Sequence, residues 1–167
     1  MGALMKSVLS SALIFAIIGT AFAVDKTTDS EVDTLLADVA SSPCNIDAKQ
    51  AVSIKLDAHS LLLPADFVFR GLDGGMARFV QGTASTPQSY AYVYISLENE
   101  NLFKLGDYGK LISDLPAIVR IEHPAGNRPV NTLYQISVFL GKYKLTLTTT
   151  SRVSAVSILS CFDKVTN

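Results

Sequence analysis

From Tyr90 to Leu97 the sequence alternates strictly between two kinds of side chain. The even positions hold three tyrosines and a serine, and the odd positions are aliphatic: Tyr90, Tyr92, Tyr94 and Ser96 against Ala91, Val93, Ile95 and Leu97. Because successive side chains of a β-strand point to opposite faces, this alternation predicts a strand with one tyrosine face and one aliphatic face. One of the two faces must meet a core, since two solvated faces would expose a large apolar or aromatic area.

Further strands and three helices are predicted around this segment. Period-two patterns and turn residues indicate strands over 52–57, 66–70, 76–81, 117–123, 130–140 and 143–150. Apolar spacings of three and four residues predict helices over 29–41 and 107–115, and Ser151 can cap a final helix. This order indicates an α+β fold, in which a largely antiparallel sheet of about six or seven strands carries an N-terminal, a mid-chain and a C-terminal helix.

Two glycine-containing segments are predicted to be the turns of hairpins. Gly71–Gly75 can supply the positive φ angles that the reversal between strands 66–70 and 76–81 needs. In the pair Gly141 and Lys142, glycine suits the first position of a type II′ turn, which would join the last two strands.

Residues 1–23 have the pattern of a secretory signal peptide. Lys6 precedes an apolar run over 8–18, and small residues then lead to Ala23. The run is shorter than the about 20 apolar residues that a membrane span needs, and the sequence contains no second run. We therefore expect cleavage before Val24 and a secreted chain, periplasmic in a Gram-negative bacterium, without an integral membrane segment.

The charge distribution divides the mature chain. Without Lys6, 13 basic side chains face 15 acidic ones, and the net charge of 13 − 15 = −2 argues against a nucleic-acid partner. Residues 24–47 hold six acidic side chains and one lysine, whereas 48–167 hold 12 basic and 9 acidic ones. We predict an acidic N-terminal helical segment, 24–47, either folded onto or separate from a single α+β domain, 48–167.

The two cysteines, Cys44 and Cys161, both remain after the predicted cleavage. Export would place them in a compartment in which thiols oxidise, and neither belongs to a C-x-x-C redox motif. We predict a structural disulfide between them, with two free thiols or one nucleophilic thiol as the competing interpretations. The bond would close a loop of 161 − 44 = 117 residues.

The sequence contains no motif that indicates catalysis, a metal site or a cofactor. Its two histidines, His59 and His123, are 123 − 59 = 64 residues apart and do not match a zinc-binding spacing. No serine lies in a G-x-S-x-G motif, and the glycines of 71–75 form neither a phosphate-binding loop nor a dinucleotide fingerprint. We therefore name no catalytic residue, metal ligand or cofactor, and we favour a function without catalysis.

The candidate binding residues are Tyr90, Tyr92 and Tyr94. If the aliphatic face meets the core, the tyrosines form a rigid amphipathic stripe of the type enriched in binding sites. If a helix covers the tyrosines instead, they are core residues with hydroxyl groups at the rim. The sequence leaves both arrangements open, and the binding hypothesis requires the first.

These observations lead to one functional hypothesis and two alternatives. The hypothesis is an exported, non-catalytic binding or inhibitory domain that acts on a protein or a small ligand. The first alternative is a small secreted hydrolase or lipid-handling enzyme with a pocket between sheet and helix. The second is an envelope-accessory structural protein.

Overall fold

The computed structural model describes residues 29–82, 90–97, 110–123 and 131–162. The predicted signal peptide, 1–23, lies outside the described residues. The described elements, in chain order, are α1 (Asp29–Ser41), β1 (Val52–Leu56), β2 (His59–Leu63), β3 (Phe67–Asp73), β4 (Met76–Gln81), β5 (Ala91–Leu97), β6 (Lys110–Ile112), β7 (Leu115–Glu122), β8 (Leu133–Leu140), β9 (Tyr143–Thr149) and α2 (Arg152–Leu159). The mixed α+β class predicted from the sequence is confirmed.

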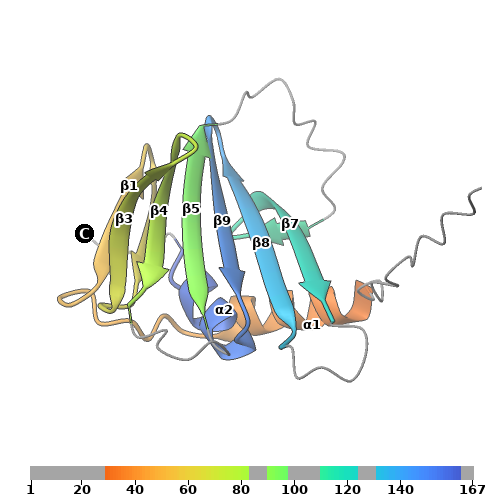
Figure 1. The fold of residues 1–167 in the computed structure, drawn as a ribbon. Coiled ribbons are helices and arrows are strands. Elements are labelled where there is room, and N and C mark those ends of the chain that lie inside the picture. The colour runs from red at the N-terminus through yellow and green to blue at the C-terminus, as the bar shows by residue number, and fades with distance from the viewer. Residues whose placement is uncertain (1–28, 83–89, 98–109, 124–130, 163–167) are drawn as a thin grey trace, which may run out of the picture.

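Seven of the strands form one antiparallel sheet, in the order β3-β4-β5-β9-β8-β7-β6 (Figure 1). Strand β5 pairs with β9 over its whole length, from Ala91 opposite Thr149 to Leu97 opposite Tyr143. The hairpin of β8 and β9 turns at Gly141, whose φ of 59° fits the predicted type II′ turn. The segment that alternates between tyrosine and aliphatic residues thus becomes an interior strand with neighbours on both edges.

Strands β1 and β2 form a separate two-stranded antiparallel sheet. They are joined by a tight turn in which Asp57 has a φ of 53°, a left-handed conformation that aspartate tolerates better than most residues. Leu61 of β2 forms an antiparallel bridge with Phe162, and α2 packs against β2. This small sheet is therefore attached to the C-terminal end of the described chain.

The two helices bury apolar stripes against the same side of the large sheet. Helix α1 has its apolar residues at the helical spacing, and it buries Val32, Leu35 and Val39. The N-cap of α2 is Ser151, whose side chain accepts a hydrogen bond from the backbone N–H of Ser154 at 3.2 Å. Helix α1 packs on β6 and β7, and α2 packs on β9 and on α1, so together they cover one face (Figure 1).

The core lies between these helices and the aliphatic face of the sheet. The central strands contribute fully or almost fully buried side chains, among them Val93, Ile136, Val138, Leu145 and Leu147. No described helix packs on the opposite face of the sheet. The molecule therefore has one covered and one open sheet face among its described residues.

The predicted mid-chain helix over 107–115 is wrong from Lys110 onward. Residues 110–112 form β6, and β7 begins at Leu115. Between them Ser113 and Asp114 have φ angles of 49° and 64°, the two positive values of a type I′ hairpin turn. The apolar residues fall at helical spacings by coincidence, because a two-residue turn places Ile112 opposite Leu115, three residues further along the chain.

The sequence also missed or misplaced parts of two further strands. Strand β2 was not predicted, because Leu61, Leu62 and Leu63 are all buried and show no alternation. Strand β3 runs through Gly71 as far as Asp73, where the prediction had placed the turn. A register irregularity between Phe69 and Leu72 accommodates Gly71 at a φ of 94°, a conformation that favours glycine.

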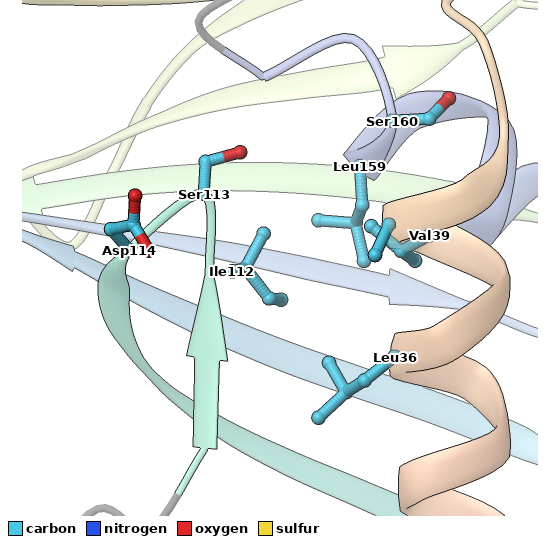
Figure 2. Close-up of a pocket in the computed structure, with 8 residues that line it drawn as sticks. Leu36, Val39, Ile112, Ser113, Asp114, Leu159 and Ser160 are labelled. Carbon is cyan, nitrogen blue, oxygen red and sulfur yellow. The ribbon is translucent and has the colours of Figure 1, made fainter.

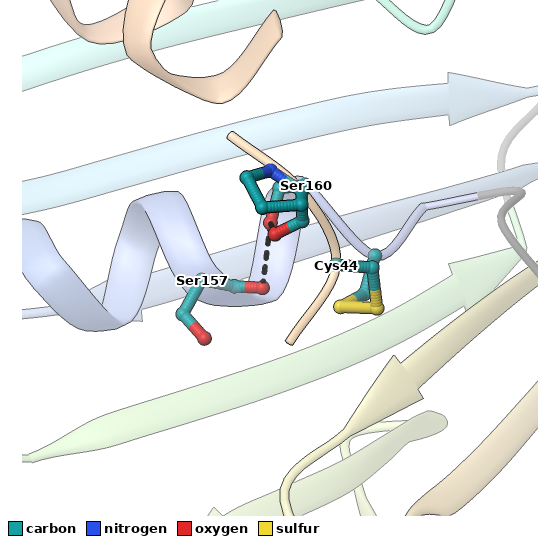
Figure 3. The surroundings of a disulfide bond; sticks show 5 residues. Cys44, Ser157 and Ser160 are labelled. Carbon is teal, nitrogen blue, oxygen red and sulfur yellow. Dashed lines mark hydrogen bonds between the residues drawn. A yellow bond between two sulfur atoms is a disulfide. The ribbon is translucent and has the colours of Figure 1, made fainter. Parts of the chain in front are cut away.

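The predicted disulfide between Cys44 and Cys161 is present, with a Cα–Cα distance of 4.6 Å. It links the segment after α1 to the residues that follow α2, and Cys161 is fully buried. Next to it, the Ser160 hydroxyl donates a hydrogen bond to the carbonyl oxygen of Ser157 at 3.1 Å and also approaches that of Pro43 at 3.5 Å (Figure 3). The bond is compatible with an oxidising compartment, extracellular or periplasmic.

Candidate functional site

The tyrosines of β5 and of the residue before it lie on the open face of the sheet. We call these residues the tyrosine stripe: Tyr90, Tyr92 and Tyr94. The intervening Ala91, Val93 and Ile95 are 1%, 0% and 8% exposed and belong to the core. The tyrosines are each half-buried, on the side away from both helices. The aliphatic face thus meets the core, which is the arrangement that the binding hypothesis requires.

Ring contacts order the tyrosine stripe. The ring centroids of Tyr90 and Tyr92 are 5.1 Å apart, and those of Tyr92 and Tyr94 are 6.3 Å apart, with tilted planes. The guanidinium carbon of Arg78 lies 5.8 Å from the centroid of the Tyr92 ring, within the range of a cation–π contact. The stripe is therefore a packed aromatic surface, and Tyr92 is the ring with contacts on both sides and to a cation.

Hydroxyl groups continue this face across the next two strands. In the register of β5 and β9, Thr146 lies opposite Tyr94 and Thr148 lies opposite Tyr92. Ser137 of β8 lies opposite Thr146, and their hydroxyl oxygens are 3.0 Å apart. The open face thus changes from aromatic to polar within two strands, and its polar part can donate and accept hydrogen bonds.

The open face is hollowed over β7, β8 and β9, by a cavity of about 260 Å³. We call it the β7–β9 hollow. It is lined by Ile118, Arg120, Gln135, Ser137, Phe139, Lys144 and Thr146. This lining holds two basic side chains, three uncharged polar ones and no carboxylate. Among the described residues, the hollow is therefore a positively charged site that borders the tyrosine stripe through Thr146.

The acidic side chains of α1 are paired on the other side of the molecule. Two carboxylates of the helix form ion pairs with other elements, Asp33 with Lys110 and Asp38 with Arg152, and Glu31 is within hydrogen-bond distance of the His123 ring. The hydrogen bond to the Asp33 carboxylate raises the pKa of the Lys110 ammonium group. The acidic helix is therefore folded onto the sheet rather than separate from it.

The two histidines do not meet at a common site in the described structure. The Nε2 atom of His123 lies 3.0 Å from Glu31, and its Nδ1 atom lies 3.2 Å from the hydroxyl of Thr132. His59 lies on β2, opposite Leu56 of β1. Among the described residues, no three histidine, cysteine, aspartate or glutamate side chains gather as metal ligands.

A second cavity, of about 350 Å³, lies on the helix side of the sheet. Figure 2 shows Leu36 and Val39 of α1, Ile112 of β6 and Leu159 of α2 around it, and Asp114 of the β6–β7 turn stands at its edge. Asp114 is the only titratable side chain in its lining, as far as the structure is described. The cavity offers an apolar volume but no pair of groups for acid–base catalysis.

In comparisons with known proteins, no family model and no curated protein matches this chain. Within the described residues, no helix is both long enough and apolar enough to cross a membrane. The geometry of the two sheet faces is therefore the basis on which a function can be inferred.

The sequence identified only part of this site. The tyrosine stripe was singled out because its residues alternate along one strand. Arg120 and Gln135 of the hollow were not, since each comes from a different strand and they become neighbours only through the register of β7 and β8. The one available signal was the row of polar residues on β9, which placed Lys144 and Thr146 on the same side of one strand.

Proposed function

We propose that this chain is an exported, non-catalytic binding or inhibitory domain, and that the open face of its large sheet contacts the partner, a protein or a small ligand. The observation that carries the proposal is the placement of the tyrosine stripe. It is half-buried on the face without a described helix, whereas the aliphatic residues between its members are buried. Tyrosine rings on an interior strand form a contact surface with little conformational entropy to lose on binding.

The rigidity of the scaffold also supports a binding function. Strand β5 is held by β4 on one edge and by β9 on the other, so the tyrosine backbone is fixed on both sides. The disulfide from Cys44 to Cys161 ties the helix layer together behind the sheet. A binding face built on strands that cannot shift needs less ordering when a partner arrives.

The test compares partner capture by variants of the mature chain. The immobilised protein is exposed to the envelope and secreted material of its native cells, with Tyr92→Ser as the test variant. Val153→Ser is the matched control, because Val153 is a 79% exposed apolar residue on α2, away from the open face. We expect Tyr92→Ser to lose about 1–3 kcal/mol of affinity, the usual contribution of an aromatic anchor, and Val153→Ser to retain the partner.

Two results would count against this proposal. Equal retention of the captured component by Tyr92→Ser and by the wild-type chain would remove the tyrosine stripe from the interface. Loss of the component by Val153→Ser alone would place the interface on the helix side instead. Circular dichroism of each variant establishes that the compared proteins are folded.

A second candidate function, binding of an apolar ligand, is favoured by the helix-side cavity. Its walls are formed by Leu36, Val39, Ile112 and Leu159, and its volume of about 350 Å³ lies in the range of small-molecule sites. If this cavity holds a ligand, Ala40→Phe should fill part of it and displace a fluorescent fatty acid, while Tyr92→Ser should have no effect. Unchanged uptake of the probe by Ala40→Phe would rule out this candidate.

A further inference from the structure

The β7–β9 hollow brings together two basic side chains from strands that are not neighbours. Arg120 lies on β7 and Lys144 on β9, with β8 between them. In the register, Arg120 is opposite Gln135, and Lys144 is opposite Phe139, four residues further along β8. Because adjacent strands are about 4.8 Å apart and residues about 3.4 Å apart, the two backbones stand at opposite corners of the hollow. Their long side chains line the same cavity from these two corners.

Arg120 differs in its pairing from two other basic side chains, Arg78 and Lys142. Arg78 has Asp73 at 3.6 Å, and Lys142 has Asp57 at 3.6 Å. Arg120 forms no ion pair with any residue that the structure describes, and no carboxylate lines the hollow. An anion that enters the hollow would therefore meet the guanidinium of Arg120, whose charge no lining carboxylate offsets.

The floor of the hollow adds hydrogen-bond donors between the two cations. The hydroxyls of Ser137 and Thr146 are 3.0 Å apart, so one hydroxyl hydrogen serves their mutual contact and the other can point to a ligand. The amide group of Gln135 can donate from the same wall. With a volume of about 260 Å³, the hollow is many times larger than the roughly 30 Å³ that a water molecule occupies.

We infer that the β7–β9 hollow is a binding site for a small organic anion, recognised through a carboxylate or phosphate group. The guanidinium of Arg120 supplies paired N–H donors for such an oxyanion, and Lys144 supplies a second positive charge from the opposite corner. The hydroxyl of Ser137 or Thr146 that is not the donor in their mutual contact donates to one of the remaining oxygens. This inference rests on the proposed function in one respect: it assigns a ligand class to the sheet face that the proposal takes as the binding face.

The test is a titration of the mature protein, followed by two-dimensional NMR of backbone amides. The probes are inorganic phosphate and citrate, which separate the two sources of the anionic group, and glycerol is the uncharged control. We expect saturable shifts at Ser137 and Thr146 with phosphate, with citrate or with both, and none with glycerol. Arg120→Gln and Lys144→Gln should each weaken this binding at least tenfold, whereas Arg70→Gln, an exposed arginine on β3, should leave it unchanged.

A variant that retains both cations tests the site against general attraction to a basic surface. Ser137→Leu places an apolar side chain on the floor of the hollow, and we expect it to abolish the saturable shifts. If neither anion gives saturable shifts in the wild-type protein, or if Arg70→Gln weakens binding as much as Arg120→Gln, the inference is wrong.

The titration also separates this inference from the proposed function. Tyr92→Ser leaves every lining residue of the hollow in place, so anion binding should persist in that variant. Anion binding together with loss of the tyrosine-dependent partner would uphold both. Anion binding with no role for Tyr92 in partner capture would uphold the hollow and overturn the proposed function, and the reverse pattern would do the opposite.

Discussion

Replacement of Tyr92 by serine should lower the free energy of unfolding by much less than the removal of a core aromatic residue would. The ring contacts of Tyr92 in the described structure are those with Tyr90, Tyr94 and the guanidinium of Arg78. Exposed aromatic pairs contribute about 0.5 kcal/mol each at the low end of their range, and an exposed cation–π contact contributes about 0.5 kcal/mol. We therefore expect Tyr92→Ser to lower the free energy of unfolding by about 1–2 kcal/mol.

The matched control is the same substitution on the covered face of the sheet. Tyr134 of β8 lies opposite the buried residues Ile121 and Thr149 and packs against the core. Removal of a core aromatic ring costs about 3–5 kcal/mol, and a half-buried Tyr134 should lie near 3 kcal/mol. The two variants thus change the same atoms in the two environments that the sequence could not distinguish.

Urea unfolding followed by circular dichroism measures both variants on one scale. The midpoint of Tyr92→Ser should lie close to that of the wild type, the midpoint of Tyr134→Ser should be clearly lower, and the slope of each transition should be unchanged. A loss of 3 kcal/mol or more in Tyr92→Ser (about the core value) would refute the reasoning. The tyrosine stripe would then serve stability, and the binding proposal would lose its named residues.

Three further predictions concern the helix layer. Reduction of Cys44–Cys161, whose ends are 117 residues apart, should lower the free energy of unfolding by roughly 4–5 kcal/mol, and a urea titration with reductant that shows less than about 1 kcal/mol would contradict the chain-entropy argument. Ser151→Ala should cost about 1 kcal/mol in the same assay through loss of the N-cap of α2, whereas Ser151→Asp should retain the cap. Pairing with Asp33 raises the pKa of Lys110 in the folded protein. The ion pair therefore stabilises the fold at pH values below the pKa of an unfolded lysine, and this stabilisation is lost as the pH rises through the pKa of Lys110 in the folded protein. The difference in Tm between the wild type and Lys110→Met should thus be constant at neutral pH and shrink above pH 10.5.

The sequence predicted those elements whose burial pattern repeats along the element itself. Helix α1 and strands β5 and β9 present a regular period, so their types and approximate bounds were correct. The short strands β2 and β6 were not predicted, because neither of them shows such a regular period. Three consecutive leucines in β2 are buried because α2 and the end of the chain pack around that hairpin, which is a tertiary effect. Strand β6 is too short to show a period, and Asp114, a residue type that adopts the left-handed conformation more readily than most, was a local indication of the turn.

The site shows the same limit at the level of function. The tyrosine stripe lies within one short alternating segment, so the sequence could name Tyr90, Tyr92 and Tyr94 as candidates, although it could not decide which face is covered. The β7–β9 hollow draws its residues from three strands, and Arg120 and Lys144 line the same cavity only through the antiparallel register of these strands. A site assembled across strands has no spacing in the sequence that a pattern search could detect.

The distribution of charge connects the two faces. Helix α1 places its carboxylates next to Lys110, Arg152 and His123, so the acidic N-terminal segment offsets basic groups at the helix side and the sheet edge. None of these side chains lines the β7–β9 hollow. A chain with nearly balanced total charge can therefore present a locally positive surface on its open face, beside a stripe of aromatic rings. Since exposed charges interact over only about 8–10 Å at physiological ionic strength, the acidic helix behind the sheet weakens the attraction of that face for an anion only slightly.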